Sequence, residues 1–348
     1  MNTREMLFAR LRCQGITDAR FRNVESVIGW MGAVQAQDYG QAKWAVGMRC
    51  AAREAEVDAA FNEGRILRTH VLRPTWHFVL PADIGWMLRL TAPRVKAFCQ
   101  PYHRKLGIDA AVLKRSKTIM IKAMEGGQQL TRVELAAQLR AAKIDTSDIR
   151  MNFLLMDAEL DGLICSGARK GASFTYALLE GRVGRQNEYP GEAALAELTR
   201  RYFQSRGPAT AAGLAWWGGM TLGQARRGLD MVGKDLERVL VGGEEYWWGG
   251  EEAGKMREVV LLPGFDEYMV GYKDRSAMLP PEFAKQTAHG LRPVVLVRGR
   301  VAGMWKRNVV KGEVTVEVSP LGEWSARQSQ LVKKEAARFE SWSGIVSR

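Results

Sequence analysis

The alternation of apolar and polar positions divides the chain into a long helical part and a shorter strand-rich part. The pattern is clearest at residues 111–180, where two helical segments separated by Gly126-Gly127 precede a third amphipathic helix and two short apolar strands. Thr131 starts the second helix and Glu134 follows three residues later, which is the spacing of a capping box. Three helices followed by a hairpin is the element order of a winged helix-turn-helix.

Two other stretches show the same order of elements without sequence identity between them. The first contains the probable hairpin "RTHVLRPTWHFVL", and the last has helices split at Gly207-Pro208 before the strand-like "LERVLV" and "EEYWW". From residue 257 the pattern changes to short strands with Gly-containing turns, ending in one helix. We therefore expect an α+β fold of three tandem winged-helix units and a smaller β-rich module, at residues 1–108, 109–188, 189–256 and 257–348.

The charge of the chain favours a polyanionic partner. Its 348 residues include 51 Lys and Arg against 38 Asp and Glu, a formal net charge of +13. The excess lies at the two ends, with 16 basic and 10 acidic residues in 1–110 and 11 basic and 5 acidic residues in 290–348. If both ends meet in the fold, they form a basic concave surface suited to nucleic acid. Many basic proteins have no such partner, so charge alone leaves this open.

Several common classes of protein and of active site are disfavoured. No apolar run of about 18 residues is present and the N-terminus is charged, so we expect a cytoplasmic protein that does not enter a membrane. Its four cysteines form no C-x-x-C pair, which indicates free thiols. The four histidines lack metal-ligand spacing and no G-x-S-x-G motif occurs, so we expect no metal and no cofactor.

Three polar groups remain as candidates for chemistry. Gln35 and Gln37 stand in "GAVQAQDYG", where two amides either hydrogen-bond the loop backbone or contribute to a site. Strand alternation in "RPTWHFV" places Thr75 and His77 on one face, although a lone histidine on a strand is more often structural. The cluster "FDEYMVGYKDRS" is either a surface ion-pair network or part of a site. Its charged residues are Asp266, Glu267, Lys273, Asp274 and Arg275.

Four motifs in one order carry a resemblance to a known family. "VQAQD", "LRPTWHFV", "RGPATAAGLAWWGG" and "LLPGFDEYMVGYKDRS" together resemble the AlkZ/AlkX-like winged-helix DNA glycosylases over roughly residues 5–340. The resemblance implies tandem winged helices with a positively charged concave surface. It also implies excision of alkylated purines, including bulky N7 adducts and interstrand crosslinks. The family signature is Gln-x-Gln or Gln-x-Asp; Gln35 and Gln37 match the first, AlkZ-like form, and Asp38 is one residue out of register for the second.

The resemblance gives the two glutamines a chemical role. An N7-alkylated purine is already cationic, so its glycosidic bond is weak without a general acid. Gln35 and Gln37 would hold a water and place oxygen dipoles near an oxocarbenium-like transition state. Both face the same way only if their segment is extended, because residues i and i+2 diverge in a helix. The resemblance also points to side chains that contact DNA, namely Arg73, Thr75, His77, Lys273 and Arg275.

The expected partner is double-stranded DNA carrying alkylated purines, bound by a monomeric, monofunctional DNA glycosylase. The alternative is a non-enzymatic winged-helix DNA-binding protein or transcription regulator. Such a regulator usually dimerises and inserts a basic recognition helix. The chain has no evident zipper helix, and "LTRVELAAQL" is only weakly charged. A nuclease is disfavoured by the missing metal-ligand sets.

Overall fold

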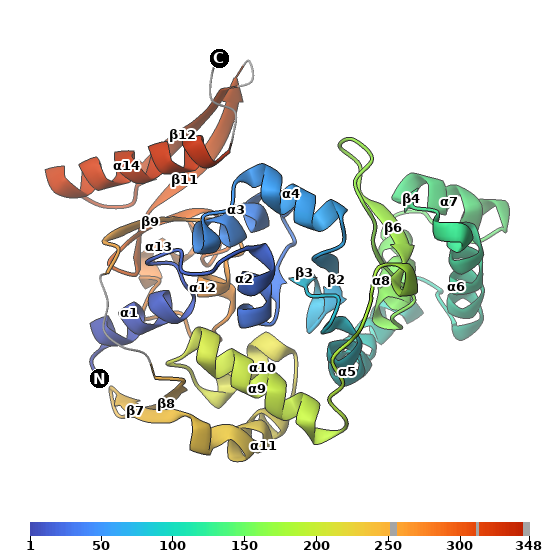
Figure 1. Cartoon of the computed structure of the whole chain (residues 1–348), viewed down its shortest axis with the longest axis horizontal. Helices are drawn as coiled ribbons and strands as arrows, with labels where there is room; N and C mark the ends of the chain where they lie inside the picture. The colour runs from blue at the N-terminus through green and yellow to red at the C-terminus, as the bar shows by residue number, and fades with distance from the viewer. Residues whose placement is uncertain (251–255, 311–312, 344–348) are drawn as a thin grey trace.

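The computed structural model describes residues 1–250, 256–310 and 313–343 (Figure 1). Within these ranges, helices surround four small antiparallel sheets, in agreement with the predicted mixture of helices and strands. The predicted ranges 1–108, 109–188, 189–256 and 257–348 serve below as names for the first, second, third and C-terminal parts. None of the helices in the described ranges is long and apolar enough to cross a membrane.

The first part has five helices and a three-stranded sheet in the order β1-β3-β2. The edge strand β1 is only two residues long, and it pairs with β3 so that Gln35 lies opposite His77. Ala36 continues the pairing by donating its N–H to the carbonyl oxygen of Trp76 at 2.7 Å. The elements are α1 (Thr3–Cys13), α2 (Val24–Met31), β1 (Val34–Gln35), α3 (Tyr39–Cys50), α4 (Glu54–Asn62), β2 (Leu67–Val71), β3 (Arg73–Val79) and α5 (Ile84–Lys105).

The second part contains the predicted helices and hairpin in the predicted order. Thr131 and Glu134 form the expected capping box at the start of α7. Most of its buried apolar residues form a cluster of their own, whereas Met156, Leu160, Cys165 and Leu179 belong to the main cluster of the chain. The part lies at the opposite end of the molecule from α14 (Figure 1). The elements are α6 (Ala110–Met124), η1 (Glu125–Gly127), β4 (Leu130–Thr131), α7 (Arg132–Ala141), α8 (Arg150–Leu160), β5 (Ile164–Ser166), β6 (Thr175–Leu178) and η2 (Leu179–Gly181).

The third part also follows the predicted order of helices and strands. Gly207 ends its first helix, and Thr210 caps the next by accepting from the N–H of Gly213 at 3.1 Å. The described elements are α9 (Glu192–Arg206), α10 (Ala211–Gly218), α11 (Leu222–Val232), η3 (Gly233–Asp235), β7 (Glu237–Val241) and β8 (Glu244–Trp248).

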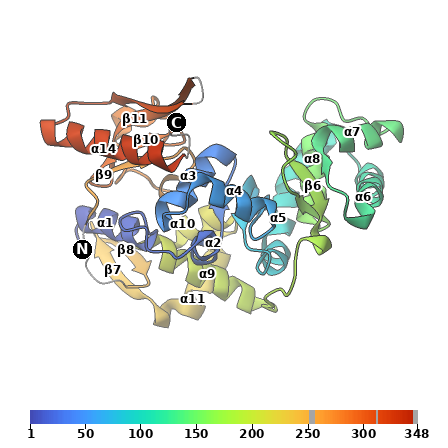
Figure 2. The same ribbon diagram turned by 45° about the horizontal axis from the view of Figure 1, so that its top comes forward.

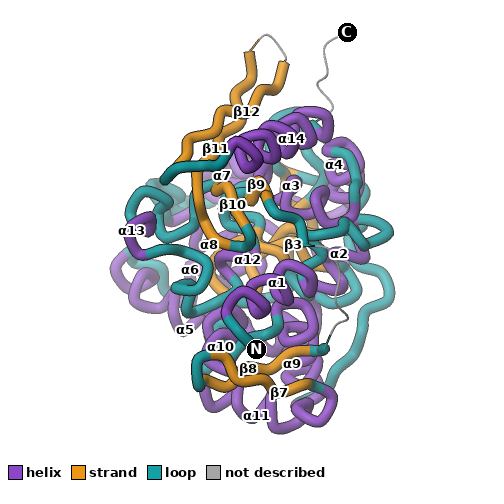
Figure 3. Tube along the Cα trace, turned by 90° about the vertical axis from the view of Figure 1, so that its left-hand side faces the viewer, coloured by secondary structure: helices purple, strands orange, loops and turns teal. Residues whose placement is uncertain are grey.

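The C-terminal part differs from the prediction at one segment. Residues 257–279 were expected to form short strands with Gly-containing turns, but Glu267–Val270 form the short helix α12, because the Asp266 side chain accepts from the N–H of Tyr268 at 2.8 Å and caps the turn. The remaining elements are β9 (Val259–Leu262), α12 (Glu267–Val270), α13 (Pro281–Ala284), β10 (Val294–Val297), β11 (Arg300–Val310), β12 (Glu313–Pro320) and α14 (Ala326–Trp342). The strands β12-β11-β10-β9 form one sheet, and β11 and β12 extend beyond the body of the molecule (Figure 3).

The C-terminal part packs on the first part, so the two ends of the chain meet. The Trp44 ring contacts Phe339 and Trp342 of α14, with centroid distances of 5.1 and 4.9 Å. Trp44 also donates from Nε1 to the carbonyl oxygen of Leu261 in β9 at 2.8 Å. In the rotated view, α14 and β9 again lie close to α3 and α1 (Figure 2).

A buried ion pair connects these two parts. Arg49 of α3 donates from both terminal nitrogens to the Asp266 carboxylate, each at 2.8 Å, and both side chains are completely buried. Arg49 also donates to the backbone and side-chain oxygens of Gln14, both at 2.9 Å. Loss of one partner would leave the other charge buried and unpaired, which strongly destabilises a fold. This pair therefore specifies how α12 lies against the first part.

Removal of one member of this pair tests its structural role. We expect Asp266→Ala to lower the free energy of unfolding by about 3–5 kcal/mol, because it leaves the Arg49 guanidinium buried and unpaired. The exposed pair Arg238–Glu245 is the control, and Glu245→Ala should change stability by about 0–1 kcal/mol. Denaturant unfolding of both variants measures the difference; equal effects would contradict the assignment.

Candidate active site

The Gln-x-Gln segment lies between two helices, and its strand part ends at Gln35. Helix α2 ends at Gly32, which has a positive φ of 72°. Helix α3 starts after Asp38, whose side chain accepts from the N–H of Gln41 at 3.1 Å. Of the residues between, Val34 and Gln35 pair with β3 as an edge strand. Gln35 therefore lies on extended backbone and Gln37 in the bend that follows it, both outside any helix.

The two amides have different surroundings. Gln35 is only 7% exposed, and its Oε1 accepts from Nη2 of Arg73 at 3.2 Å. Gln37 is exposed, and its Oε1 accepts from the backbone N–H of Trp76 at 3.3 Å. Both oxygens thus bond to groups of β3. Gln35 lines the large cavity beside this strand, whereas Gln37 is not among the residues that line it.

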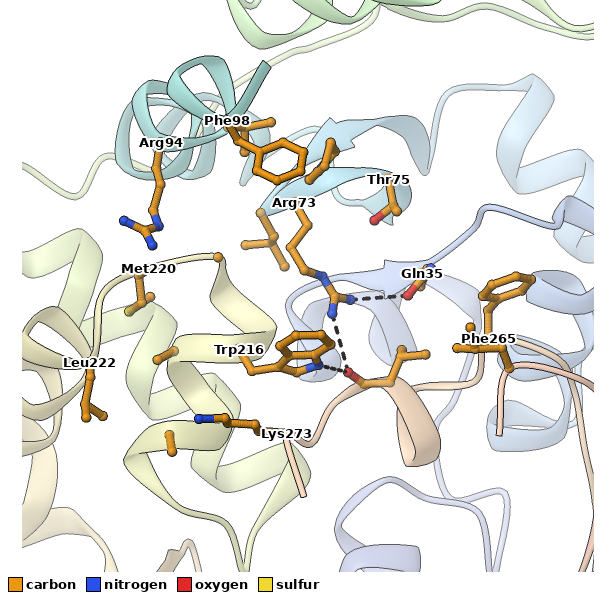
Figure 4. Close-up of a pocket in the computed structure, with 18 of the residues that line it drawn as sticks. Gln35, Arg73, Thr75, Arg94, Phe98, Trp216, Met220, Leu222, Phe265 and Lys273 are labelled. Atoms are coloured by element: carbon orange, nitrogen blue, oxygen red, sulfur yellow. Dashed lines mark hydrogen bonds between the residues drawn. The ribbon is translucent and has the colours of Figure 1, made fainter. Parts of the chain in front are cut away.

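This cavity has a volume of about 800 Å³ and lies between β3, α5, α10 and the loop that follows α12 (Figure 4). Much of its wall is apolar. The apolar residues are Leu72, Pro74, Val95, Phe98, Ala212, Ala215, Trp216, Met220, Leu222, Phe265, Val270 and Leu291.

The polar part of the wall is cationic. Its charged residues are Arg73, Arg94, Lys273 and Arg275, and none of the described residues lining the cavity carries a carboxylate. Arg73 bonds only to neutral oxygens, namely Gln35 Oε1 and, at 3.4 Å, the carbonyl oxygen of Val270. Arg275 likewise donates to the carbonyl oxygen of His289 at 2.8 Å. An uncompensated group of cations favours an anionic ligand.

One face of β3 carries buried polar atoms without a partner among the described residues. They are Arg73 Nε, Thr75 Oγ1 and His77 Nε2. Arg73 and Thr75 line the cavity, but His77 does not, and its side chain is fully buried. His77 Nδ1 lies 2.9 Å from the carbonyl oxygen of Thr75 and must donate to it, which leaves Nε2 as an acceptor. Burial holds the pKa of His77 well below its ordinary value, so the imidazole is neutral.

A buried carboxylate behind the cavity wall positions Gln35. Glu267 Oε1 accepts from the backbone N–H of Gln35 at 2.8 Å. Its Oε2 accepts from Nη2 of Arg206 at 2.6 Å and from Nε1 of Trp217 at 2.9 Å. Arg206 in turn donates to the carbonyl oxygens of Met31 and Ala33 at 2.8 and 2.9 Å. The Glu267–Arg206 pair therefore holds the backbone of Met31, Ala33 and Gln35 in place.

The structure brings five of the seven predicted site residues to one cavity. These are Gln35, Arg73, Thr75, Lys273 and Arg275, while Gln37 and His77 lie outside its lining and their roles stay predictions. The prediction omitted the cavity residues Arg94, Phe98 and Trp216, and it left open whether the charged cluster lies on the surface. Asp266 and Glu267 of that cluster are in fact buried. The signal available in the sequence was the presence of aromatic residues, Phe98 and Trp216, in the segments that form α5 and α10.

The described residues contain no group of three His, Cys, Asp or Glu side chains arranged to hold a metal ion. The four cysteines are buried and unpaired. Burial raises the pKa of the Cys165 thiol to about 12, which makes it a poor nucleophile. The arrangement therefore offers amide, guanidinium and aromatic groups to a ligand in the cavity.

Comparison with known proteins gives two matches. The family model of AlkZ-like DNA glycosylases matches residues 28–342, which include the Gln-x-Gln segment and all lining residues of the cavity. The structure is similar to that of the DNA glycosylase AlkZ from Streptomyces sahachiroi, with a TM-score of 0.80 and 24% sequence identity over 100% of this chain and 98% of that chain. This similarity shows a shared fold. No curated protein sequence matches the chain.

The buried imidazole predicts a pH-dependent stability. The unfolded His77 binds a proton near its ordinary pKa of 6.5, whereas the folded side chain stays neutral to much lower pH. Stability is therefore full above pH 6.5 and falls as the pH drops, by about 1.4 kcal/mol per unit from this group until the folded pKa is reached. Unfolding measured between pH 7.5 and 5 should show a smaller slope for His77→Asn, and an unchanged slope for the exposed control His289→Asn.

Proposed function

This chain belongs to the AlkZ-like DNA glycosylase family, and from that premise we propose that it hydrolyses the N-glycosidic bond of cationic N7-alkylated purines, leaving an abasic site. DNA is the substrate that the family implies. One observation carries the finer proposal. The amide of Gln35 lies on the wall of the cavity, in a lining that has no carboxylate among the described residues.

If the purine is already positively charged, an amide on the cavity wall is enough to promote hydrolysis, and no carboxylate is needed. The base leaves as a neutral group, so no acid has to protonate it. Bond cleavage develops positive charge on the sugar, and a water must attack that carbon. The Gln35 carbonyl oxygen has two lone pairs, of which one accepts from Arg73, and the other is suited to orient the water. Preorganised dipoles of this kind stabilise the transition state without ionising.

Gln37 supplies the second amide of the proposed mechanism. It follows Gln35 by two residues, in the bend after β1, and the amides of both residues bond to β3. Its oxygen accepts from the Trp76 N–H, which leaves a lone pair of that oxygen for substrate or water. The exposure of Gln37 suits a contact with the DNA strand that covers the cavity.

The cations that line the cavity together with Gln35 form the proposed binding surface for phosphates. In the proposed complex, Arg73, Lys273 and Arg275, together with Thr75, hold the strand that carries the lesion, and neutral His77 supports Thr75 from within the sheet. The three helix-rich parts are proposed to be winged helices that form the basic concave surface of a monomer. The cavity volume of about 800 Å³ lies in the range of pockets for drug-sized ligands, which suits bulky adducts and crosslinks.

Loss of the two amides tests the enzymatic proposal. We expect Gln35→Ala to lower the rate of release of N7-methylguanine by about 10²–10³-fold, as for removal of one preorganised catalytic dipole. Gln35→Ala/Gln37→Ala should abolish release above background. Duplex DNA is incubated with each protein and abasic sites are cleaved with alkali. Gln100→Ala, the same change at an exposed position of α5 outside the cavity lining, is the control. DNA binding without abasic sites in the wild type would favour a non-enzymatic binding protein.

The salt dependence of binding tests the cationic wall. The logarithm of the DNA affinity should fall linearly with the logarithm of salt concentration, by about 0.9 for each phosphate that is contacted. Lys273→Gln should therefore make the slope shallower by about one such step, whereas Lys334→Gln on α14 should leave it unchanged. Fluorescence anisotropy at several salt concentrations measures both slopes. Equal slopes for the two variants would contradict a phosphate contact at Lys273.

A further inference from the structure

Trp216 is an exposed indole held in one orientation. It lies on α10 with 46% of its surface exposed, whereas the next residue, Trp217, is fully buried. Its Nε1 donates to the carbonyl oxygen of Val270 at 3.2 Å, so the polar edge of the ring is anchored and the rest borders the cavity. Leaving an indole exposed forgoes the stabilisation that burial gives. A fixed, exposed aromatic surface is suited to stacking with a ligand.

A second exposed aromatic side chain lies across the cavity. Phe98 is 57% exposed on α5, with Arg94 one turn before it and Tyr102, 44% exposed, one turn after it. The Phe98 and Tyr102 ring centroids are 6.0 Å apart. This helix therefore presents a row of cationic and aromatic side chains that begins in the cavity. Surfaces that bind exposed bases combine the same two residue types.

A hydrogen-bonded network links one of the two aromatic side chains to the Gln35 amide. Phe98 and Trp216 lie on opposite sides of Arg73 (Figure 4). Trp216 and Arg73 donate to the same carbonyl oxygen, that of Val270, and Arg73 also donates to Gln35 Oε1. Two shared hydrogen-bonding groups thus connect the indole to the Gln35 amide. A ring stacked on Trp216 would lie beside that amide.

The charge of the cavity identifies the class of occupant. Four cations and no carboxylate from the described residues line it, so an uncharged apolar peptide or an acyl chain would leave the cations uncompensated. The exposed aromatic surfaces of Trp216 and Phe98 border the same cavity. A ligand that combines an aromatic ring with an anionic backbone satisfies both features. Nucleotides have this combination.

We propose that Trp216 and Phe98 form an aromatic clamp that stacks on a planar ring of the damaged nucleotide. This inference rests on the proposed glycosylase function and adds the residues that recognise the lesion. The ring is either the alkylated purine turned out of the duplex or an aromatic appendage on its N7 substituent. Both offer the same stacking surface, and the arms of one experiment separate them.

The experiment compares three duplexes that differ at one guanine. They carry N7-methylguanine, an N7 adduct with an aromatic appendage, and an N7 adduct with an aliphatic chain of similar length. We expect Trp216→Ala/Phe98→Ala to lower kcat/KM by about 10–100-fold, a range consistent with the loss of base–aromatic stacking. Trp216→Phe/Phe98→Tyr keeps both rings and should stay within about threefold of the wild type. Leu240→Ala, an exposed apolar truncation on β7, is the control.

The pattern across the duplexes identifies the ring. A loss with all three supports stacking on the purine itself, and a loss confined to the aromatic adduct supports stacking on the appendage. Equal kcat/KM for the double alanine variant and the wild type on every duplex would overturn the clamp.

Fluorescence provides a readout that does not need cleavage. The emission difference between the wild type and Trp216→Phe reports on the indole at position 216, and a stacked ring should quench it when a duplex with a stabilised glycosidic bond is added. An unquenched signal at saturating duplex overturns the clamp. A quenched signal, combined with no base release by the wild type from the three unstabilised duplexes, supports the clamp while contradicting the glycosylase proposal, so the two failures are distinguishable.

Discussion

The site depends on one fully buried carboxylate, that of Glu267. It bonds the backbone of Gln35 in the first part of the chain and the side chains of Arg206 and Trp217 in the third, while it belongs to the C-terminal part. A charge at 0% exposure is stable only when all of its hydrogen bonds are made. The three parts must therefore assemble together before the Gln-x-Gln segment has its final position.

The elements of the fold were largely predictable because their signals are local. The capping box of Thr131 and Glu134 spans four residues. The alternation of polar and apolar residues that predicts β3 likewise lies within the strand itself. The error at α12 has a different origin. The Asp266 carboxylate that caps this helix is compensated by Arg49, 217 positions away, and no local pattern identifies that partner. Buried carboxylates next to apolar residues therefore gave the appearance of an exposed, strand-like segment.

The sequence predicted many of the residues of the site, but not how deeply each side chain is buried. The motifs contained Gln35, Arg73 and Lys273, all of which line the cavity. Alternation along β3 assigns a face to each residue, but not how far that face is covered, so the complete burial of His77 was not predictable. The adjacent tryptophans show the same limit. Trp216 is exposed and Trp217 buried, a difference set by how α10 packs on α9 and α12.

The placement of charge around the cavity connects DNA binding to reactivity in the proposed mechanism. Glu267 lies behind the wall, where Arg206 compensates it, and the four cations lie in front. Without DNA the cavity is therefore positive, which opposes both a cationic base and an oxocarbenium-like sugar. Backbone phosphates that pair with the cations remove this opposition, and the Gln35 dipole then acts on the developing charge. A free alkylated nucleoside brings no phosphates, so in the proposed mechanism the same arrangement favours a lesion that is still part of a strand.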